Sequence, residues 1–386
     1  MAGAGSKASG QQEFSHRVPG GFRFGRPAVW GVLFLALTAG VFGYQFHRVG
    51  PGEKILIAGR LQWGYFLFLI FLFPAETILS ALRMRMICKV LQPDVSFRTC
   101  IMAELANAGM AILTPSQTGG GPGQMYMLHR GGAKMGTALT ISLLTFMGTM
   151  VSLLGMGVYT LIAVGSGRVG LLFAAAVYTI TAVAALILSS AAWPGLFRTA
   201  MSGSSRLYRR MRGGGIPPAE WWPPGDPRTG PAADRMGPLA IKVVDMLYVY
   251  REELGRFLRK GKAVFLLTCL LSLLFFCSRI LIAFLCVRFL GIRDSSFGEI
   301  AGIQAALAFV TYFGPTPGSA GIAEGASLLA MDGIVTAGFA PYYNLLWRFF
   351  SAYLAAFAGI LLIFRSVFFD VRRQARRKWK GGANPP

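Results

Sequence analysis

The sequence has few charged residues. Only 14% of its 386 residues are Asp, Glu, Lys or Arg, whereas about a quarter is usual for a soluble domain. Acidic side chains are the scarcest, with 16 Asp and Glu against 38 Lys and Arg. Because 54% of the residues are hydrophobic and long apolar runs recur, the composition excludes an ordinary soluble protein. It predicts an integral membrane protein.

Histidine and cysteine are also scarce. The three histidines and five cysteines form no H-E-x-x-H or C-x-x-C pattern, and G-K-[ST] does not occur. The cysteines lie in or beside apolar segments, where a thiol behaves as a small buried hydrophobic group. We therefore expect no metal site, no cofactor, no disulfide framework and no enzymatic activity.

The net charge of +22 comes from basic residues gathered in a few loops and in the two tails. A nucleic-acid-binding surface would interleave basic and aromatic residues, and the sequence shows no such pattern. Basic residues concentrated on one side of the apolar runs follow the positive-inside rule instead. The charge therefore predicts anionic lipids of the inner leaflet as neighbours and no nucleic acid as a partner.

Six apolar runs are long enough to cross a bilayer, which takes about 20 residues per helix. They are 28–46, 63–82, 139–164, 169–193, 263–290 and 342–364. The sequence divides into a disordered basic cytoplasmic tail (1–27), a first membrane half (28–193), a cytoplasmic Pro-rich loop with a basic amphipathic helix (194–262), a second membrane half (263–365) and a basic cytoplasmic tail (366–386). For the first run a cleaved signal peptide is the competing interpretation, and the long polar tail before it favours an uncleaved helix.

The amphipathic helix is expected over residues 239–260. One interpretation places it on the anionic inner leaflet, because its polar face is basic. The other makes it a simple extension of the next membrane span. The sequence leaves both open.

A Pro/Gly-rich turn occurs twice inside apolar sequence. The first copy reads LTPSQTGGGPGQ (113–124) and the second reads FGPTPGSAGIAE (313–324). A shift of 200 pairs Ser96 with Ser296 and Gln124 with Glu324. Helix-breaking residues at matching places in two halves of a membrane protein indicate a binding site near the bilayer midplane.

Each turn joins two apolar arms and predicts a re-entrant hairpin, at 97–135 and at 297–340. Two short antiparallel crossings per hairpin fit the same pattern. With the N-terminus inside, the loops richest in Lys and Arg, including Arg83, Arg85 and Lys89, fall in the cytoplasm, and six crossings place both termini there. Three crossings separate the hairpins, so they enter from opposite sides. The predicted fold is an all-α polytopic membrane protein with about six full spans and two re-entrant hairpins in an inverted-topology repeat.

The turns suggest how a ligand could be held. We expect a short helix to begin near Gly121 and another near Gly321, each with unpaired amides and the positive end of its dipole at the turn. Such helix ends bind anions, phosphate in particular. The alternative is that Pro and Gly only allow a tight turn.

Gln124 and Glu324 each lie three residues after one of these glycines. This is the capping-box position, where the side chain accepts from or donates to the helix end. The functional alternative for Glu324 is an ion pair or a proton-coupling role, because a carboxylate at membrane depth costs about 2.5–3.5 kcal/mol.

Further ionisable residues in the apolar runs are Glu76, Glu104, Arg279, Arg288 and Arg348. Arg279 and Arg348 are expected to contact a phosphate, because guanidinium binds it in a bidentate manner and stays charged. The alternative for both is an internal salt bridge to Glu324 or Glu104. The full set of predicted substrate-binding residues is Pro115, Gln117, Thr118, Gly119, Gly120, Gly121, Gln124, Arg279, Pro315, Thr316, Pro317, Gly318, Gly321, Glu324 and Arg348.

The segments TPSQTGGGPGQMYMLHRGGAKMGTALTISLLTF (114–146), FGPTPGSAGIAEGA (313–326) and LLWRFFSAYLAAFAG (345–359) resemble the flippase-like membrane region of the lysylphosphatidylglycerol synthase family. The resemblance extends from about Trp30 to Phe364. It implies a membrane region that moves an aminoacylated phospholipid between leaflets, and a bacterial inner (plasma) membrane. The longest polar stretch is short and Pro-rich, so we expect no counterpart of the family's soluble aminoacyl-transfer domain and do not carry over its activity.

The leading hypothesis is therefore a phospholipid translocase whose partner is a membrane phospholipid with an anionic or phosphate-bearing headgroup. The alternatives are a carrier of a small soluble anion, a transferase subunit acting on a lipid-linked substrate, and a membrane protein that serves as a partner of others. The sequence leaves homo-oligomer formation open.

Overall fold

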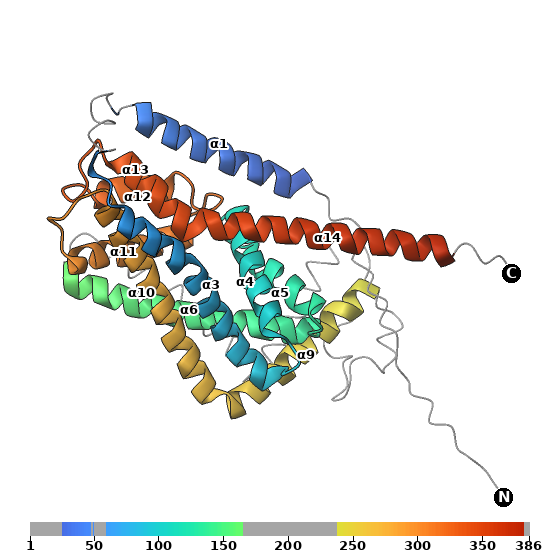
Figure 1. The fold of residues 1–386 in the computed structure, drawn as a ribbon. Helices are drawn as coiled ribbons and strands as arrows, with labels where there is room; N and C mark the ends of the chain where they lie inside the picture. Colours follow the sequence, from blue (N-terminus) through green and yellow to red (C-terminus); the bar gives the residue numbers. More distant parts are fainter. Residues whose placement is uncertain (1–24, 48, 50–58, 165–237, 382–386) are drawn as a thin grey trace, which may run out of the picture.

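The computed structural model describes residues 25–47, 49, 59–164 and 238–381. Over these ranges the secondary structure is helical, and no β-strand occurs in them. Figure 1 shows α1 (Gly25–His47) beside the long C-terminal helix α14 (Leu354–Gly381). The all-α prediction holds for the described part of the chain.

Five described helices are long and apolar enough to cross a membrane. They are Val29–His47, Trp63–Leu91, Met135–Tyr159, Lys262–Phe289 and Ala340–Arg372. The predicted span 169–193 lies outside the described residues. The chain is thus a multi-pass membrane protein, and the expectation of about six spans is neither confirmed nor contradicted.

Helix α3 (Trp63–Leu91) is longer than the sequence predicted. The predicted span ended at residue 82 and placed Arg83 in a loop, but the helix continues past Arg83 and buries its side chain to 4% exposure. This part of the prediction is wrong because a charged residue does not end a helix. Arg83 remains inside because several hydroxyl groups accept its hydrogen bonds.

The first arms of the two hairpins match the prediction. They form α4 (Phe97–Ile112) and α11 (Phe297–Phe313). Both begin with a serine N-cap, since Ser96 Oγ accepts from the Thr99 amide at 3.2 Å and Ser296 Oγ accepts from the Glu299 amide at 3.1 Å. The pairing of Ser96 with Ser296 therefore reflects a shared structural role.

The second arms are α5 (Gly120–Arg130) and α12 (Ile322–Ala330). Between the arms, TPSQTG (114–119) and TPGSAG (316–321) fold alike. In each turn the amide of the fourth residue donates to the carbonyl of the first, and the amide of the fifth donates to the carbonyl of the second. The true shift inside the turns is thus 202, from Pro115 to Pro317.

The two-residue difference comes from Gly314 and Pro315, which precede the second turn and have no counterpart in the first. The equivalent of Gly321, which caps α12, is therefore Gly119, which caps α5. The prediction that Gln124 and Glu324 hold the same position relative to their caps is wrong. Gln124 lies deeper in its helix.

The two turns meet. Pro115 and Pro317 form an isolated antiparallel bridge. Gln117 Nε2 donates to the Thr311 carbonyl at 2.9 Å, and the Ser319 hydroxyl donates to the same oxygen. Five turn residues have positive φ: Ser116 (50°), Gln117 (56°), Gly318 (56°), Ser319 (56°) and Gly321 (81°). Non-glycine residues rarely adopt this conformation, and such residues often mark functional sites.

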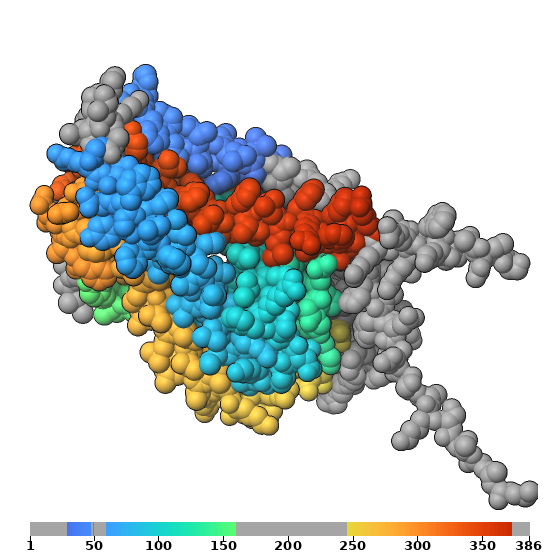
Figure 2. All heavy atoms as spheres, in the orientation of Figure 1, coloured from blue at the N-terminus to red at the C-terminus, as the bar shows by residue number. Residues whose placement is uncertain are grey.

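Helix α4 lies at the centre of one face, with α3 on one side and α14 on the other, as Figure 2 shows. Two glycines bring α4 and α14 together. A Cβ atom on Gly359 would lie 1.8 Å from the Leu105 carbonyl oxygen, and one on Gly109 would lie 2.6 Å from the Ile360 nitrogen. Only glycine permits this approach of the two backbones.

The basic amphipathic helix is α9 (Pro238–Lys260), close to its predicted bounds. It is separated from α10 (Lys262–Phe289) by Gly261, so it is not a straight extension of the next span. Its apolar side packs with α6 (Met135–Val164) through the buried side chains of Tyr250, Leu254 and Phe257.

Each hairpin has its own apolar core. One cluster joins α3 to α4, α5, α6 and α9, and the other joins α10 to α11, α12 and α13 (Ala340–Arg348). Between α13 and α14 the backbone forms a π-helical segment, η2 (Phe349–Tyr353). Single π-helical turns inside helices are frequently found at functional sites.

Candidate functional site

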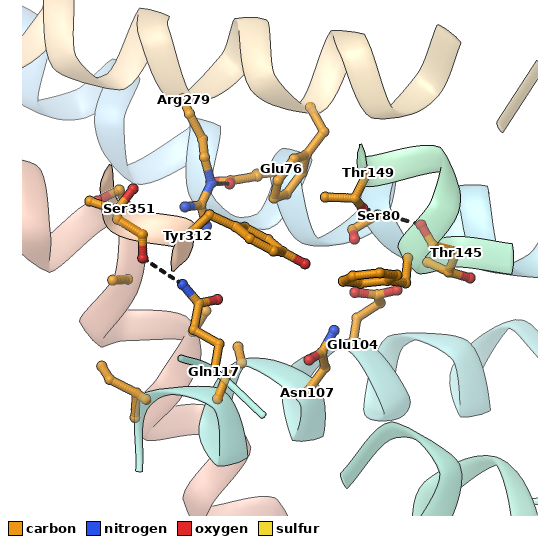
Figure 3. Close-up of a pocket in the computed structure, with 18 of the residues that line it drawn as sticks. Glu76, Ser80, Glu104, Asn107, Gln117, Thr145, Thr149, Arg279, Tyr312 and Ser351 are labelled. Atoms are coloured by element: carbon orange, nitrogen blue, oxygen red, sulfur yellow. Dashed lines mark hydrogen bonds and ion pairs between the residues drawn. The ribbon is translucent and has the colours of Figure 1, made fainter. Parts of the chain in front are cut away.

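A cavity of about 790 Å³ lies where the two hairpins meet. Its walls come from α3, α4, α5, α6, α10 and α11, from both Pro/Gly turns, and from the segment that runs from α13 through η2 to the start of α14. Figure 3 shows labelled side chains from α3, α4, α6, α10, α11, η2 and the first turn around one space. The two halves of the chain therefore share one site.

Seven of the predicted site residues line this cavity: Gln117, Thr118, Gly121, Gln124, Arg279, Gly318 and Arg348. The other eight are absent from its lining: Pro115, Gly119, Gly120, Pro315, Thr316, Pro317, Gly321 and Glu324. The second set builds the turns and caps the helices behind the cavity wall. Sequence reasoning located both turns but did not separate scaffold residues from lining residues.

Glu324 is fully buried behind the wall. Its carboxylate accepts from the Gly321 amide at 2.6 Å and from the Tyr353 hydroxyl at 3.1 Å. It also pairs with Arg348, with 2.8 Å between Nε and Oε1. The expected capping contact and the expected internal salt bridge of Glu324 are both confirmed.

Arg348 borders the cavity, but its partners hold it in the wall. Besides the pair with Glu324, its Nη2 donates to the Gly318 carbonyl at 2.6 Å, and its guanidinium lies 5.2 Å from the centre of the Tyr353 ring. With 5% of the side chain exposed, it ties α13 to the second turn. Loss of either partner would leave the other charge buried without a counter-ion, which is strongly destabilising.

Gln124 does not cap its helix, which corrects the capping-box expectation. Helix α5 begins at Gly120, four residues earlier. The Gln124 amide instead crosses to the neighbouring helix, where Nε2 donates to Glu104 Oε1 at 3.2 Å. Gln124 therefore orients a carboxylate at the cavity wall.

Arg279 is the most available cation in the cavity. Its Nε donates to Glu76 Oε1 at 2.8 Å, and the side chain stays 41% exposed. The guanidinium lies 4.9 Å from the centre of the Phe275 ring, a cation–π distance. Among the described residues nothing accepts a hydrogen bond from its two Nη atoms, and Figure 3 shows the group pointing into the cavity.

Arg83 and Glu104 form a third ion pair at the cavity. The closest approach is 3.7 Å between Arg83 Nη2 and Glu104 Oε1, too long for a hydrogen bond. Arg83 instead donates to three hydroxyls: Thr149 at 2.9 Å, Ser272 at 3.0 Å and Ser80 at 3.3 Å. Its buried Nε has no partner among the described residues.

Sequence reasoning missed Arg83 as a site residue. The signal was present, because Glu76, Ser80 and Arg83 are spaced four and three residues apart and so share one helix face. The hydropathy pattern ended the predicted span at residue 82, so Arg83 was not assigned to this helix face. Other lining residues that the prediction did not include are Ser80, Asn107, Ser142, Thr145, Thr149, Gln304, Tyr312 and Ser351.

Charge is balanced around the cavity. The three arginines in its lining each have a carboxylate partner: Arg83 with Glu104, Arg279 with Glu76, and Arg348 with Glu324. Within the described ranges, no group of three or more His, Cys, Asp or Glu side chains could hold a metal ion. The site is a neutral, hydroxyl-rich cavity with one partly free guanidinium.

One of the comparisons with known proteins identifies a family. The sequence matches the family described as the lysylphosphatidylglycerol synthase TM region over residues 29–359. No curated protein and no solved structure matches the chain. The matched range contains both turns and all residues that line the cavity.

Proposed function

Because the chain belongs to the family of the lysylphosphatidylglycerol synthase transmembrane region, we propose that it moves phospholipids between the leaflets of its membrane. The polar headgroup enters the cavity between the two hairpins, and the acyl chains remain in the bilayer. In this proposal the chain makes no covalent change to the lipid. The family membership supports a role in lipid modification or translocation, and the cavity favours translocation.

The observation that carries the proposal is that Arg279 has only part of its guanidinium occupied by hydrogen bonds. Two of its nitrogens are free to bind an anion while the third keeps its bond to Glu76. A phosphate fits this arrangement because a guanidinium offers it two parallel hydrogen bonds. Every phospholipid headgroup carries such a phosphate next to its acyl chains.

The helix ends support one anion position rather than two. Gly121 and Pro122, in the first turn of α5, line the cavity, and a Cβ atom on Gly121 would meet nothing within 4 Å. The positive end of the α5 dipole therefore faces open space. At α12 the corresponding end is already occupied by the carboxylate of Glu324.

The bridge between the turns supports hairpins of opposite orientation. Pro115 and Pro317 are equivalent residues, and they pair in an antiparallel bridge. An antiparallel pair of equivalent residues is related by a local two-fold axis, which is the symmetry of an inverted repeat. In the proposed mechanism the cavity on this axis opens to one leaflet and then to the other.

The proposal is tested with purified protein in vesicles that contain a fluorescent phosphatidylglycerol. We expect the protein to expose inner-leaflet lipid to a membrane-impermeant quencher, and Arg279→Ala to slow this exchange by about tenfold or more, the effect of losing a charge-assisted hydrogen bond. Arg293→Ala is the matched control, because Arg293 is exposed and lies outside the cavity.

Exchange no faster than in protein-free vesicles, for every anionic lipid tried, would contradict the proposal. Uptake of a water-soluble phosphate ester into the same vesicles, lost in Arg279→Ala but not in Arg293→Ala, would favour the carrier of a small anion instead.

A further inference from the structure

We propose that Glu104 binds one proton when a phosphate-bearing headgroup occupies the cavity, so that lipid movement is coupled to proton movement in the same direction. This inference rests on the function proposed above. It assigns a driving force that the family membership does not supply.

The first step is charge balance. The empty cavity is neutral, because each lining arginine has a carboxylate partner. A phosphodiester brings one negative charge into it. Arg279 binds the phosphodiester through its Nη atoms and keeps the bond from its Nε to Glu76. Because no ion pair is broken, no lining cation is released to compensate the negative charge of the phosphodiester. An uncompensated charge in a cavity of low dielectric constant costs free energy. A carboxylate in the cavity wall lowers this cost when it binds a proton and becomes neutral.

The second step identifies the carboxylate that binds the proton. Glu76 holds a direct hydrogen bond from Arg279 at 2.8 Å. Glu324 lies outside the cavity lining and accepts from an amide and a hydroxyl as well as pairing with Arg348. Glu104 faces the cavity, and its arginine is 3.7 Å away, beyond hydrogen-bonding distance. Its hydrogen bond comes instead from the neutral amide of Gln124, at 3.2 Å. Of the three carboxylates, Glu104 is the one whose arginine does not approach to within 2.8 Å.

The third step concerns Arg83. Three hydroxyls already hold its guanidinium, from α3, α6 and α10, so it stays in place when Glu104 becomes neutral. Its unpartnered Nε, on a side chain 5% exposed, is a further donor at the cavity wall. Protonation of Glu104 therefore leaves Arg83 available to the bound anion.

The surroundings of Glu104 contain few other titratable groups. Those that interact with it electrostatically are Arg83 from α3, Cys100 from its own helix and Tyr312 from α11. From α5 the facing side chain is the neutral Gln124. From α14 the backbone at Gly359 packs against the neighbouring Leu105. Of the two carboxylates that line the cavity, Glu76 and Glu104, the proton is therefore assigned to Glu104, whose arginine lies beyond hydrogen-bonding distance.

The test uses full-length protein in vesicles with fluorescent phosphatidylglycerol and a lumen about one pH unit more alkaline than the outside. One proton per lipid would shift the leaflet ratio by up to about tenfold towards the alkaline side. Glu104→Gln should abolish the shift. Glu76→Gln should slow exchange and keep the shift, and Glu299→Gln, an exposed carboxylate outside the cavity, should behave as the unmodified protein.

A second measurement does not depend on any variant. A pH-sensitive dye in the lumen should report proton entry when a gradient of the lipid drives movement inward. Exchange of lipid with no redistribution under the pH gradient and no proton entry overturns the coupling and leaves the translocase in place. If no lipid exchanges at any pH, the proposed function itself fails. Persistence of the shift in Glu104→Gln overturns the assignment to this residue.

Discussion

Pro115 and Pro317 pair across an isolated antiparallel bridge, and they are the second residues of two turns with the same backbone hydrogen bonds. The bridge joins residues from opposite halves of the chain at the edge of the cavity. It explains why two Pro/Gly turns that are far apart in sequence form one site. Residues of both turns line the same cavity.

The bridge predicts an efficient cross-link between the turns. With the five native cysteines replaced, Pro115→Cys and Pro317→Cys together should form an intramolecular disulfide on mild oxidation. Residues opposite each other in an antiparallel pair have Cα atoms about 4.5–5.5 Å apart, within the range that a disulfide spans. Gel mobility after proteolysis between the halves would report the bond. A protein that stays in two fragments under oxidising conditions would contradict the pairing of the turns.

The contact of α4 with α14 predicts a strong effect of one methyl group. Gly359→Ala would place a Cβ atom 1.8 Å from the Leu105 carbonyl oxygen, so the two backbones must move apart. We expect a loss of about 3 kcal/mol or more in the free energy of unfolding, measured by thermal unfolding in detergent.

Gly155→Ala is the matched control for this change. Gly155 lies in α6, and a Cβ atom there would meet nothing within 4 Å. Alanine should stabilise the helix by about 0.5–1 kcal/mol. Equal effects of the two substitutions would show that α4 and α14 do not touch at Gly359.

Much of the fold could be predicted because its signals are local. The predicted hairpins begin at 97 and 297 and their Pro/Gly turns at 113 and 313, which agrees with the ends of α4 and α11 to within a residue. The register between the turns was missed, because the shift of 200 that aligns Ser96 with Ser296 hides the two residues inserted at Gly314 and Pro315. The sequence signal was the Thr-Pro pair that opens both turns and the glycine that closes them, and the backbone hydrogen bonds confirm the shift of 202.

The site was predicted less completely because its contacts join distant segments. Intramembrane charge identified Arg279, Arg348 and Glu324, and the pair of Arg348 with Glu324 was among the alternatives. The partner of Arg279 is Glu76, from another helix, which no sequence spacing indicates. The hydroxyls that make room for Arg83 come from three helices, so its burial depends on tertiary packing.

The buried pair of Glu324 and Arg348 predicts a non-additive loss of stability. Glu324→Gln leaves a buried guanidinium without its counter-ion and should cost about 3–5 kcal/mol. Arg348→Met should cost a similar amount, and the double variant should cost less than the sum because neither charge is then left alone.

Thermal unfolding of the four proteins in a double-mutant cycle measures this coupling. The pair of Arg130 with Asp370 is the control, because 34% and 22% of these side chains are exposed, so its coupling should stay below about 1 kcal/mol. Additive losses at Glu324 and Arg348 would mean that the two charges do not depend on one another.

The account rests on a lipid headgroup entering the cavity between the turns, and photo-cross-linking tests this most directly. A photoreactive residue at Tyr312, in the cavity lining, is compared with one at Phe357, an exposed apolar position on α14. The vesicles contain phosphatidylglycerol tagged either on the headgroup or at the end of an acyl chain. We expect position 312 to capture the headgroup tag and position 357 to capture the acyl tag. Capture of acyl tags alone at position 312, or of neither tag, would contradict the account.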